Sequence, residues 1–373
     1  MVKISRTLSD SLKKSGAKPR KKRAESLWRG PSEDGITQSL LSRFLVCPER
    51  FRLLVCEGLQ PNPQFNHRLE YGQMWHTCEE ALLAGVDWEK PLKAYAMDLS
   101  RTYPLAQEQI LGWYKVCSVQ FPVYEKFWQK HGKKLKMKPI HQEHVFEVDY
   151  VLPSARRVKL RGKFDALNLH GSGLYLQENK TKADIDEIQL RRQLKFDLQT
   201  MLYLVAAKRL KEESHEMFSG YHKKPIEGVL YNVVRRPLSG GKNTIRRHQP
   251  TKSNPRGESE DDFYKRLLGL IVEEPEYYFM RWIMRVSDAD LTEFEDKFLM
   301  PVLDHLCDWW EWICECRISG ESPFSSERGL HYQTPFGFYN VLAEGGNTDL
   351  DEYILTGNET GLCRADELFS ELK

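Results

Sequence analysis

The order of secondary-structure patterns between residues 141 and 235 constrains the fold of this chain more than any other feature. Segments rich in β-branched and aromatic residues are separated by turn residues, and a long helical pattern precedes the last of them. The expected strands and helix are His144–Val151, Val158–Leu169, Leu174–Lys180, the helix Gln189–Lys211, and Ile226–Arg235. This order indicates an α/β fold with a mixed central sheet flanked by helices.

Helical patterns lie on both sides of this segment in the sequence. The spacing of apolar residues predicts helices from about Thr37 to Leu83, over Trp88–Lys130, from about Asp261, and over Ala289–Ile318. Residues 238–263 are polar and rich in turn residues, which predicts a long loop. We therefore expect a basic arm (1–30), a helical N-terminal region (31–135), a core (136–290) and a helical C-terminal region (291–373).

The charge is unevenly distributed. The net charge of the 373 residues is only +2, so any nucleic-acid surface must come from local clusters. Residues 1–30 concentrate Lys and Arg and contain few apolar residues, which predicts a disordered arm. Such an arm suits non-specific contact with DNA phosphates, a solubilising tail or nuclear import, and composition does not separate these roles.

The sequence indicates an intracellular protein. It contains no apolar run long enough to span a membrane, and its first residues lack the apolar stretch of a secretory signal. The eight cysteines are scattered through a large chain, which is typical of free thiols in a reducing compartment. We expect a cytoplasmic protein without a membrane partner.

Three charged residues on two expected neighbouring strands carry the candidate chemistry. Glu178 and Lys180 project to the same side because side chains alternate along a strand. A short turn pairs their strand with the one that carries Asp165, which can bring the two carboxylates together. Close carboxylates repel unless a cation neutralises them, and oxygen ligands suit Mg²⁺ or Mn²⁺. Lys180 would then hold the water that attacks a phosphodiester. The alternative is an ordinary surface ion pair.

The following helix adds two candidate binding residues. Gln199 and Tyr203 are four residues apart and share one helical face. Gln can donate to a phosphate, and Tyr can hydrogen-bond or stack. The alternative is that both side chains fill the core.

Taken together, the segments Arg161–Asp165, Glu178–Lys182 and Asp197–Tyr203 resemble the RecB-like nucleases of the PD-(D/E)xK superfamily. The resemblance is closest to phage-encoded members and to CRISPR-associated RecB-like exonucleases. It implies a restriction-endonuclease-like core with helical elaborations. Phe164 stands where the motif has its proline.

The resemblance also assigns roles to individual residues. It implies that Asp165 and Glu178 bind the metal, that Lys180 assists the water, and that Gln199 and Tyr203 touch DNA. The segment Tyr71–Glu80 is similar to the upstream helix whose histidine completes the metal shell, which nominates His76. A histidine ligand would favour Mn²⁺ over Mg²⁺. A lone helical histidine is otherwise usually structural.

Many RecB-like nucleases hold an iron–sulfur cluster, and this chain is expected to lack one. Cys47 matches the first cluster cysteine, but Cys307, Cys314 and Cys316 precede the expected places of the other three. The segment His331–Tyr339 resembles the cluster region without its cysteines, and a cluster needs converging thiolates. The nearby Trp309, Trp310 and Trp312 are expected to pack in the core rather than stack on bases.

These features indicate a metal-dependent DNA nuclease. We expect an exonuclease that leaves 5′-phosphates in recombination, repair or phage DNA processing, with recombination or single-strand-binding proteins as possible partners. Arg246 and Arg247, in the long loop, suit DNA contact, although this loop would equally suit a mobile insertion. A structure-selective or nicking endonuclease and a non-catalytic DNA-binding subunit stay open as alternatives.

Overall fold

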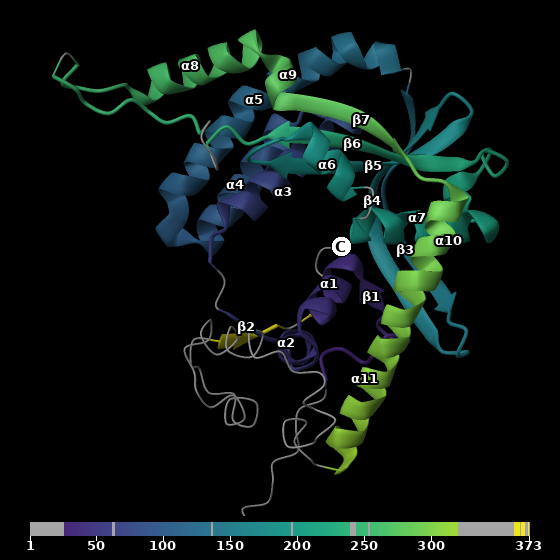
Figure 1. Cartoon of the computed structure of the whole chain (residues 1–373). Helices are drawn as coiled ribbons and strands as arrows, with labels where there is room; N and C mark the ends of the chain where they lie inside the picture. The colour runs from purple at the N-terminus through teal and green to yellow at the C-terminus, as the bar shows by residue number, and fades with distance from the viewer. Residues whose placement is uncertain are drawn as a thin grey trace, which may run out of the picture.

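The computed structural model describes residues 26–61, 64–135, 137–194, 197–238, 244–252, 254–319, 362–365, 367–369 and 372 (Figure 1). The strands are β1 (Ile36–Thr37), β2 (Leu59–Pro61), β3 (Met137–Val151), β4 (Arg157–His170), β5 (Gly173–Lys182), β6 (Ile226–Arg235), β7 (Phe279–Arg285) and β8 (Leu362–Arg364). The α-helices are α1 (Gln38–Val46), α2 (Pro48–Phe51), α3 (His67–Leu83), α4 (Glu89–Thr102), α5 (Gln107–Leu135), α6 (Glu187–Leu194), α7 (Leu198–Glu212), α8 (Glu260–Glu273), α9 (Pro275–Tyr278), α10 (Asp288–Phe294) and α11 (Met300–Ser319).

A mixed six-stranded sheet forms the centre of the molecule. Its strand order is β1-β4-β5-β6-β7, and β3 pairs with β4 as well. The β3–β4, β4–β5 and β6–β7 pairs are antiparallel, whereas β1–β4 and β5–β6 are parallel. The four predicted strands are confirmed, and β1 and β7 join them without having been predicted. The architecture is an α/β core of the restriction-endonuclease type with helical elaborations.

The sheet is forked along one edge of β4. Near its start, β4 pairs on this edge with β1, at Leu160 and Arg161. Further along, it pairs with β5, from Ala166 to His170. Within the described strands, residues 162–165 therefore have a partner only on the β3 side. This change of partner opens a gap in the sheet beside Asp165.

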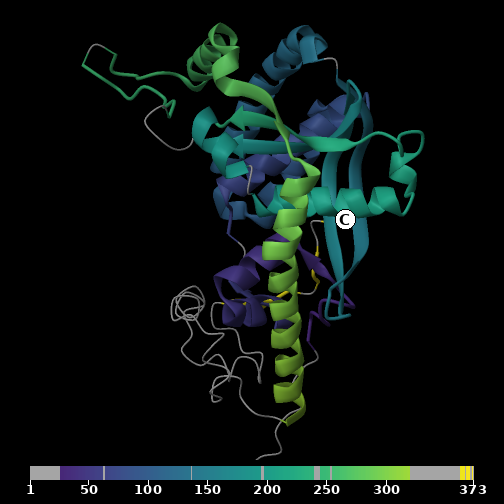
Figure 2. The same cartoon turned by 45° about the vertical axis from the view of Figure 1, so that its right-hand side comes forward.

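Helices cover both faces of the sheet (Figure 2). On one face, α1, α7 and α11 pack in a hydrophobic cluster that includes Val205, Tyr231 and Trp309. On the other face, α3, α4, α5 and α8 contact one another around Trp75 and Phe121. Trp309 and Trp312 are buried as expected, and the half-buried Trp310 packs on Trp28 with ring centroids 4.9 Å apart.

Two long helices predicted from periodicity are each interrupted. The helix expected over Gln189–Lys211 is two helices, because Asp197 is extended and its carboxylate accepts from the Thr200 N–H to cap α7. The helix expected over Trp88–Lys130 ends at Thr102, before Pro104, and resumes at Gln107. The helical spacing of apolar residues continues across both breaks. A prediction from this spacing alone therefore joined each pair of helices into one.

The structure describes only part of the N-terminal and C-terminal regions. Residues 1–25 of the basic arm and His331–Tyr339 lie outside the described residues. Near the C-terminus, β8 pairs with β2 in a separate two-stranded sheet, in a region that the sequence predicted to be helical. Of the helices described, none combines the length and the hydropathy that crossing a membrane requires. The division of the chain at residues 31, 136 and 291 stays a prediction.

Candidate active site

A cleft of about 520 Å³ occupies the fork in the sheet. It is bounded by the start of α1, by α3, by the strands β3, β4 and β5, and by α7. The cleft brings together six residues that the sequence nominated from four separate segments: His76, Asp165, Glu178, Lys180, Gln199 and, on the next turn of α7, Tyr203. These side chains, which the sequence predicted to converge, line one cleft in the structure.

Asp165 lies where β5 diverges from β4. The last paired residues are Ala166 and Gln177, so Asp165 and Glu178 follow directly in the register. Beyond this point the Asn179 backbone N–H donates to Asp165 Oδ2 at 2.7 Å. The carboxylate thus replaces a strand partner for the N–H of Asn179. The hairpin geometry inferred from the sequence accounts for this placement.

Glu178 is the centre of a compact hydrogen-bonded triangle. Lys180 Nζ lies 2.6 Å from Glu178 Oε1, and Gln199 Nε2 donates to the same oxygen at 2.9 Å. Lys180 Nζ also donates to Gln199 Oε1 at 2.7 Å. Lys180 therefore faces the same side as Glu178, as strand alternation requires. The Glu-x-Lys pair is a cleft ion pair rather than the exposed surface pair that was the alternative.

The environment of Glu178 favours its protonated form. Burial is the main cause, repulsion from Asp165 adds to it, and the attraction of Lys180 offsets only part, so the pKa of Glu178 rises to about 7. Burial would lower the pKa of Lys180, but the ion pair with Glu178 outweighs burial and raises that pKa. The cleft thus carries more negative potential than Lys180 alone neutralises.

His76 reaches the cleft from α3. Burial would lower its pKa, but the nearby carboxylates, Asp165 first, outweigh burial and raise that pKa. The imidazole and the carboxylates of Asp165 and Glu178 provide one nitrogen and several oxygen donors in a field that attracts cations. This donor set suits Mg²⁺ or Mn²⁺.

The side chains of His76, Asp165 and Glu178 do not form a complete metal-ligand set in this structure. Among the described residues, no set of three or more His, Cys, Asp or Glu side chains stands in a metal-holding arrangement. One reason is visible in the triangle, where Lys180 and Gln199 both engage Glu178 Oε1. A cation would have to compete with these two contacts for that oxygen. The residues fit the ion in chemistry, and the ligand set stays a prediction.

Gln199 projects from α7 toward β5, and Tyr203 projects toward β3 and β4. The Tyr203 ring packs edge-on against Phe146 and Phe164, with centroids 5.4 and 5.5 Å away. A Cβ at Gly162 would lie 2.9 Å from the Tyr203 ring, so only glycine lets the ring approach β4 this closely. Tyr203 therefore combines core packing with a place on the cleft wall. Contact of either residue with DNA stays a prediction.

Further cleft residues were not nominated from the sequence. Arg68, Arg236 and Lys163 add positive charge to the walls, and Arg236 Nη1 donates to the Arg68 carbonyl at 3.3 Å. Lys163 is two residues from Asp165 on β4, so strand alternation could have indicated it. Arg236 follows the last residue of β6 and is buried, and no local sequence pattern distinguishes it from the other arginines of the chain.

Two additional carboxylates stand at the rim of the cleft. Glu143 forms an ion pair with Lys163, and burial together with hydrogen bonding to Glu143 raises the pKa of Glu80 to about 7. Glu80 follows the metal-ligand candidate His76 by one helical turn, so helix spacing could have pointed to it. The rim therefore adds two carboxyl groups beyond Asp165 and Glu178, one of them paired with Lys163.

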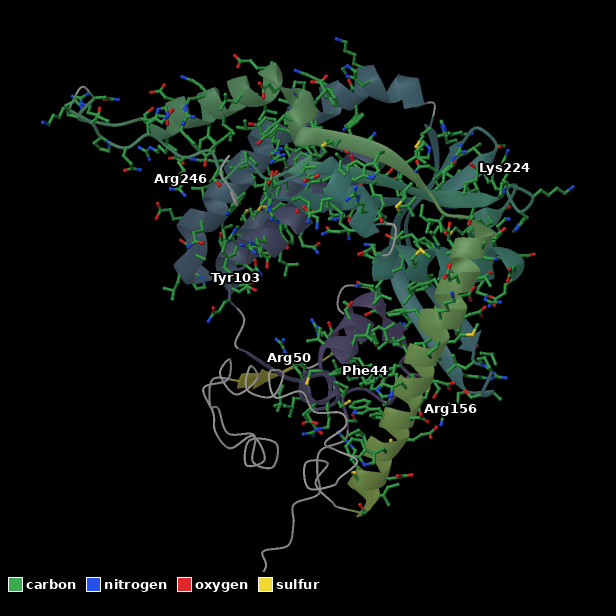
Figure 3. All side chains as sticks on the ribbon, viewed as in Figure 1. Phe44, Arg50, Tyr103, Arg156, Lys224 and Arg246 are labelled. Atoms are coloured by element: carbon green, nitrogen blue, oxygen red, sulfur yellow. The ribbon has the colours of Figure 1, made fainter. Side chains whose placement is uncertain are left out.

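Arg246 and Arg247 lie apart from this cleft. Figure 3 places Arg246 beside α8, on the segment that extends from one end of the molecule. Neither arginine lines the cleft, and Arg247 Nε donates to the Glu258 carbonyl. Their contact with DNA stays a prediction. It requires that DNA bound in the cleft extends beyond the cleft to reach these two arginines.

Cys47 has a local structural role. Its Sγ accepts from the Arg50 N–H at 3.4 Å and caps α2. The seven cysteines from Cys47 to Cys316 carry free thiols. The absence of an iron–sulfur cluster stays a prediction, because the resembling segment lies outside the described residues.

A forked mixed sheet with a carboxylate on each side of the fork and a lysine on the second strand defines a nuclease core of the restriction-endonuclease type. The PD-(D/E)XK nuclease superfamily model matches residues 36–315, and the chain belongs to that superfamily. No curated protein matches the chain at a significant level of similarity. Within the superfamily, the RecB-like assignment rests on the sequence resemblance alone.

Proposed function

We propose that the chain is a metal-dependent deoxyribonuclease of the RecB-like type that acts as an exonuclease and leaves 5′-phosphates. The observation that carries the proposal is the triangle of Glu178, Lys180 and Gln199 beside Asp165 in one open cleft. A structural ion pair alone would not need a second carboxylate and an imidazole aimed at the same space.

In this proposal Asp165, Glu178 and His76 hold Mg²⁺ or Mn²⁺. The ion would supply Lewis-acid polarisation of the scissile phosphate and a lowered pKa for an attacking water. The imidazole nitrogen in the donor set favours Mn²⁺. This preference is open to direct measurement by metal titration of the full chain.

In this proposal Lys180 orients the attacking water. In the structure its ammonium is held protonated by Glu178. A cation that shared the charge of Glu178 would weaken the interaction that raises the pKa of Lys180, and this would favour the neutral amine, which can accept a proton from the water. The water oxygen bonds to phosphorus, the bond from phosphorus to O3′ breaks, and O3′ takes up a proton to leave as a 3′-hydroxyl. The 5′-phosphate stays on the released product.

The basic walls of the cleft bind the DNA backbone in this proposal. Arg68, Arg236 and Lys163 line the same cleft as the carboxylates. Guanidinium groups pair well with phosphate oxygens, which positions a strand without reading its sequence. Gln199 and Tyr203 would contact the phosphates nearest to the scissile bond.

The decisive experiment is digestion of end-labelled linear, circular and single-stranded DNA with Mg²⁺, Mn²⁺ or a chelator. The proposal expects cleavage of linear DNA only with the metals, and mononucleotide or short products that carry 5′-phosphates. Cleavage of closed circular DNA would replace the exonuclease assignment by the endonuclease alternative. Absence of cleavage, together with absence of calorimetric Mn²⁺ binding, would indicate a non-catalytic subunit.

A further inference from the structure

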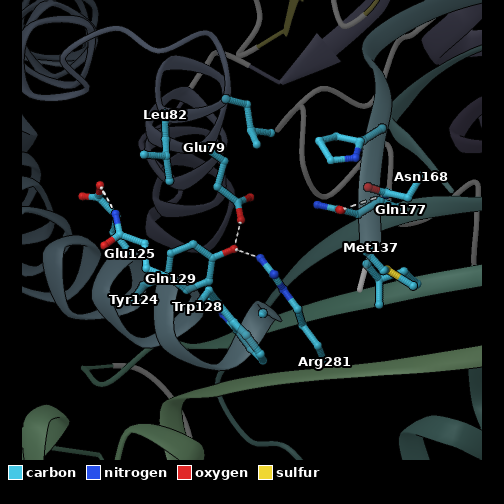
Figure 4. Close-up of a pocket in the computed structure, with 15 residues that line it drawn as sticks. Glu79, Leu82, Tyr124, Glu125, Trp128, Gln129, Met137, Asn168, Gln177 and Arg281 are labelled. Carbon is cyan, nitrogen blue, oxygen red and sulfur yellow. Dashed lines mark hydrogen bonds between the residues drawn. The ribbon is translucent and has the colours of Figure 1, made fainter. Parts of the chain in front are cut away.

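A second cavity, of about 330 Å³, lies behind the catalytic strands (Figure 4). It is enclosed by α3, α5 and the sheet. Gln177 of β5 and Asn168 of β4 line it, whereas their neighbours Glu178 and Leu167 face the other way because side chains alternate along a strand. The cavity therefore sits on the opposite face of the sheet from the triangle of Glu178, Lys180 and Gln199.

The walls of this cavity combine aromatic surface with a fixed cation. Tyr124 and Trp128 come from successive turns of α5, and the Arg281 guanidinium lies 4.2 Å from the centre of the Trp128 ring. Arg281 Nε donates to Asn232 Oδ1 at 2.9 Å, and Nη2 donates to Tyr124 Oη at 2.8 Å. These contacts hold the guanidinium in one orientation at the cavity.

In the part of the chain that the structure describes, two buried polar atoms at the cavity lack a hydrogen-bond partner. Glu79, 4% exposed, accepts through Oε1 from Tyr124 and Asn232, while its Oε2 has no partner among the described residues. The Trp128 Nε1–H is also without one. An unpaired acceptor and an unpaired donor beside one cavity are costly unless a ligand or water uses them.

We propose that this cavity binds a nucleobase. A base is planar and fits the aromatic wall, as bases stack on Trp and Tyr in single-strand-binding proteins. A base amino group can donate to Glu79 Oε2, as carboxylates accept from base amino groups elsewhere. A base carbonyl or ring nitrogen can accept from Trp128 Nε1. The remaining walls are mainly apolar, which suits a flat heterocycle better than a phosphate or a sugar.

The inference deepens the proposed function, because the choice of a nucleobase rests on DNA as the substrate. The base could come from a DNA strand that extends past the cleft or from a free mononucleotide. His76 at the cleft and Glu79 at the cavity are one turn apart on α3, a rise of about 5 Å. On α3 the two sites are therefore neighbours, and a base that flanks the strand end in the cleft is the nearest candidate occupant.

A cavity-filling variant gives the cleanest test. Gly132 of α5 lines the cavity, and a Cβ added there meets no atom within 4 Å. Gly132→Leu should therefore fold and reduce the cavity. Gly269 of α8 is equally open and lies outside the cavity, so Gly269→Leu is the matched control. Trp128→Leu and Glu79→Gln remove the wall and the acceptor.

Binding is measured with the full chain in chelator, so that cleavage plays no part. One arm titrates the four deoxynucleoside monophosphates by calorimetry. The other measures the anisotropy of labelled single strands that carry an abasic site at successive positions. We expect Gly132→Leu and Trp128→Leu to weaken binding about tenfold or more, with binding by Gly269→Leu unchanged.

Mononucleotide binding that is lost in Gly132→Leu supports the proposal with a free nucleotide as ligand. A penalty at one abasic position that disappears in Gly132→Leu supports it with a strand base as ligand. Equal binding of every probe by wild type and Gly132→Leu overturns it and leaves water as the occupant. Failure of the proposed nuclease function would show instead as unchanged cleavage in Lys180→Ala. Cleavage is measured separately from these binding titrations, so the two failures are distinguishable.

Discussion

The two faces of β5 carry opposite kinds of polar chemistry. Glu178 and Lys180 face the cleft, where the charges are closely spaced and the pKa of Glu178 is raised to about 7. Gln177 and Asn179 face the other side, where neutral amides pair with one another at 3.0 Å and with Asn232 at 2.9 Å. The difference teaches that hydrogen-bonded amides on one side of a strand can fix the position of charged, reactive side chains on its other side. Reactivity and stability should therefore respond to different substitutions.

The largest expected effect comes from the cleft face. Lys180→Ala removes the amine that orients and deprotonates the water, so kcat should fall by about 10²–10⁴-fold. The fold should persist, because Glu178 can take up a proton in the absence of its partner. Cleavage of labelled linear DNA under saturating Mn²⁺ measures the loss, and circular dichroism measures the fold.

The matched control for this loss is Lys182→Ala. Lys182 is two residues further along the same face of β5 and does not line the cleft. Its removal should leave kcat nearly unchanged. Equal losses in the two variants would mean that general positive charge, and not the position of Lys180, supports the reaction.

The next effect is a dependence of stability on pH that belongs to the cleft face. The pKa of Glu178 is raised in the folded protein from its usual 4.5 to about 7, so folding disfavours the carboxylate. The folded state then binds more protons than the unfolded state between these values, and the free energy of unfolding falls as pH rises through this window. The total contribution of Glu178 is about 3 kcal/mol.

Urea unfolding of wild type and Glu178→Gln in chelator, at pH 5 and pH 7.5, measures this contribution. The raised pKa values of His76, Glu79 and Glu80 act in the same direction in both proteins, so the difference between the two reports Glu178 together with its effect on the pKa of His76. The wild type should lose more stability than the variant on going to pH 7.5. Parallel losses would show that Glu178 is not held protonated.

A substitution behind the sheet should mainly affect stability. Asn232 contacts Glu79, Tyr124, Asn179 and Arg281 from the middle of β6. Asn232→Leu leaves these buried groups with fewer partners, and the free energy of unfolding should fall by about 1–3 kcal/mol. Activity below the unfolding transition should change much less than in Lys180→Ala. A loss of kcat as large as that of Lys180→Ala would break the contrast between the two faces.

The contrast also explains how much the sequence could predict. Strand alternation and the short turn at residues 170–173 predicted that Asp165, Glu178 and Lys180 converge, because these relations are local. The fork in the sheet depends on β1, two residues long and more than a hundred positions from β4, which no periodicity reveals. The network behind the sheet joins Glu79, Asn232 and Arg281 from three distant elements, so only the fold brings it together. Gln199 and Tyr203 both line the cleft from α7 although their helix was predicted too long, since their spacing lies wholly within α7.

The smallest expected effect concerns Tyr203, which belongs both to the cleft wall and to the core. Tyr203→Phe keeps the ring that packs against Phe146 and Phe164 but removes the hydroxyl. If the hydroxyl serves DNA, the free energy of unfolding should change little, while the Kd for DNA should rise severalfold, since a typical hydrogen bond contributes about 1 kcal/mol. Anisotropy of labelled DNA in Ca²⁺ or chelator, compared with urea unfolding, separates the two quantities. Loss of stability with unchanged DNA affinity would assign Tyr203 to the core, and the cleft face would then begin one helical turn earlier, at Gln199.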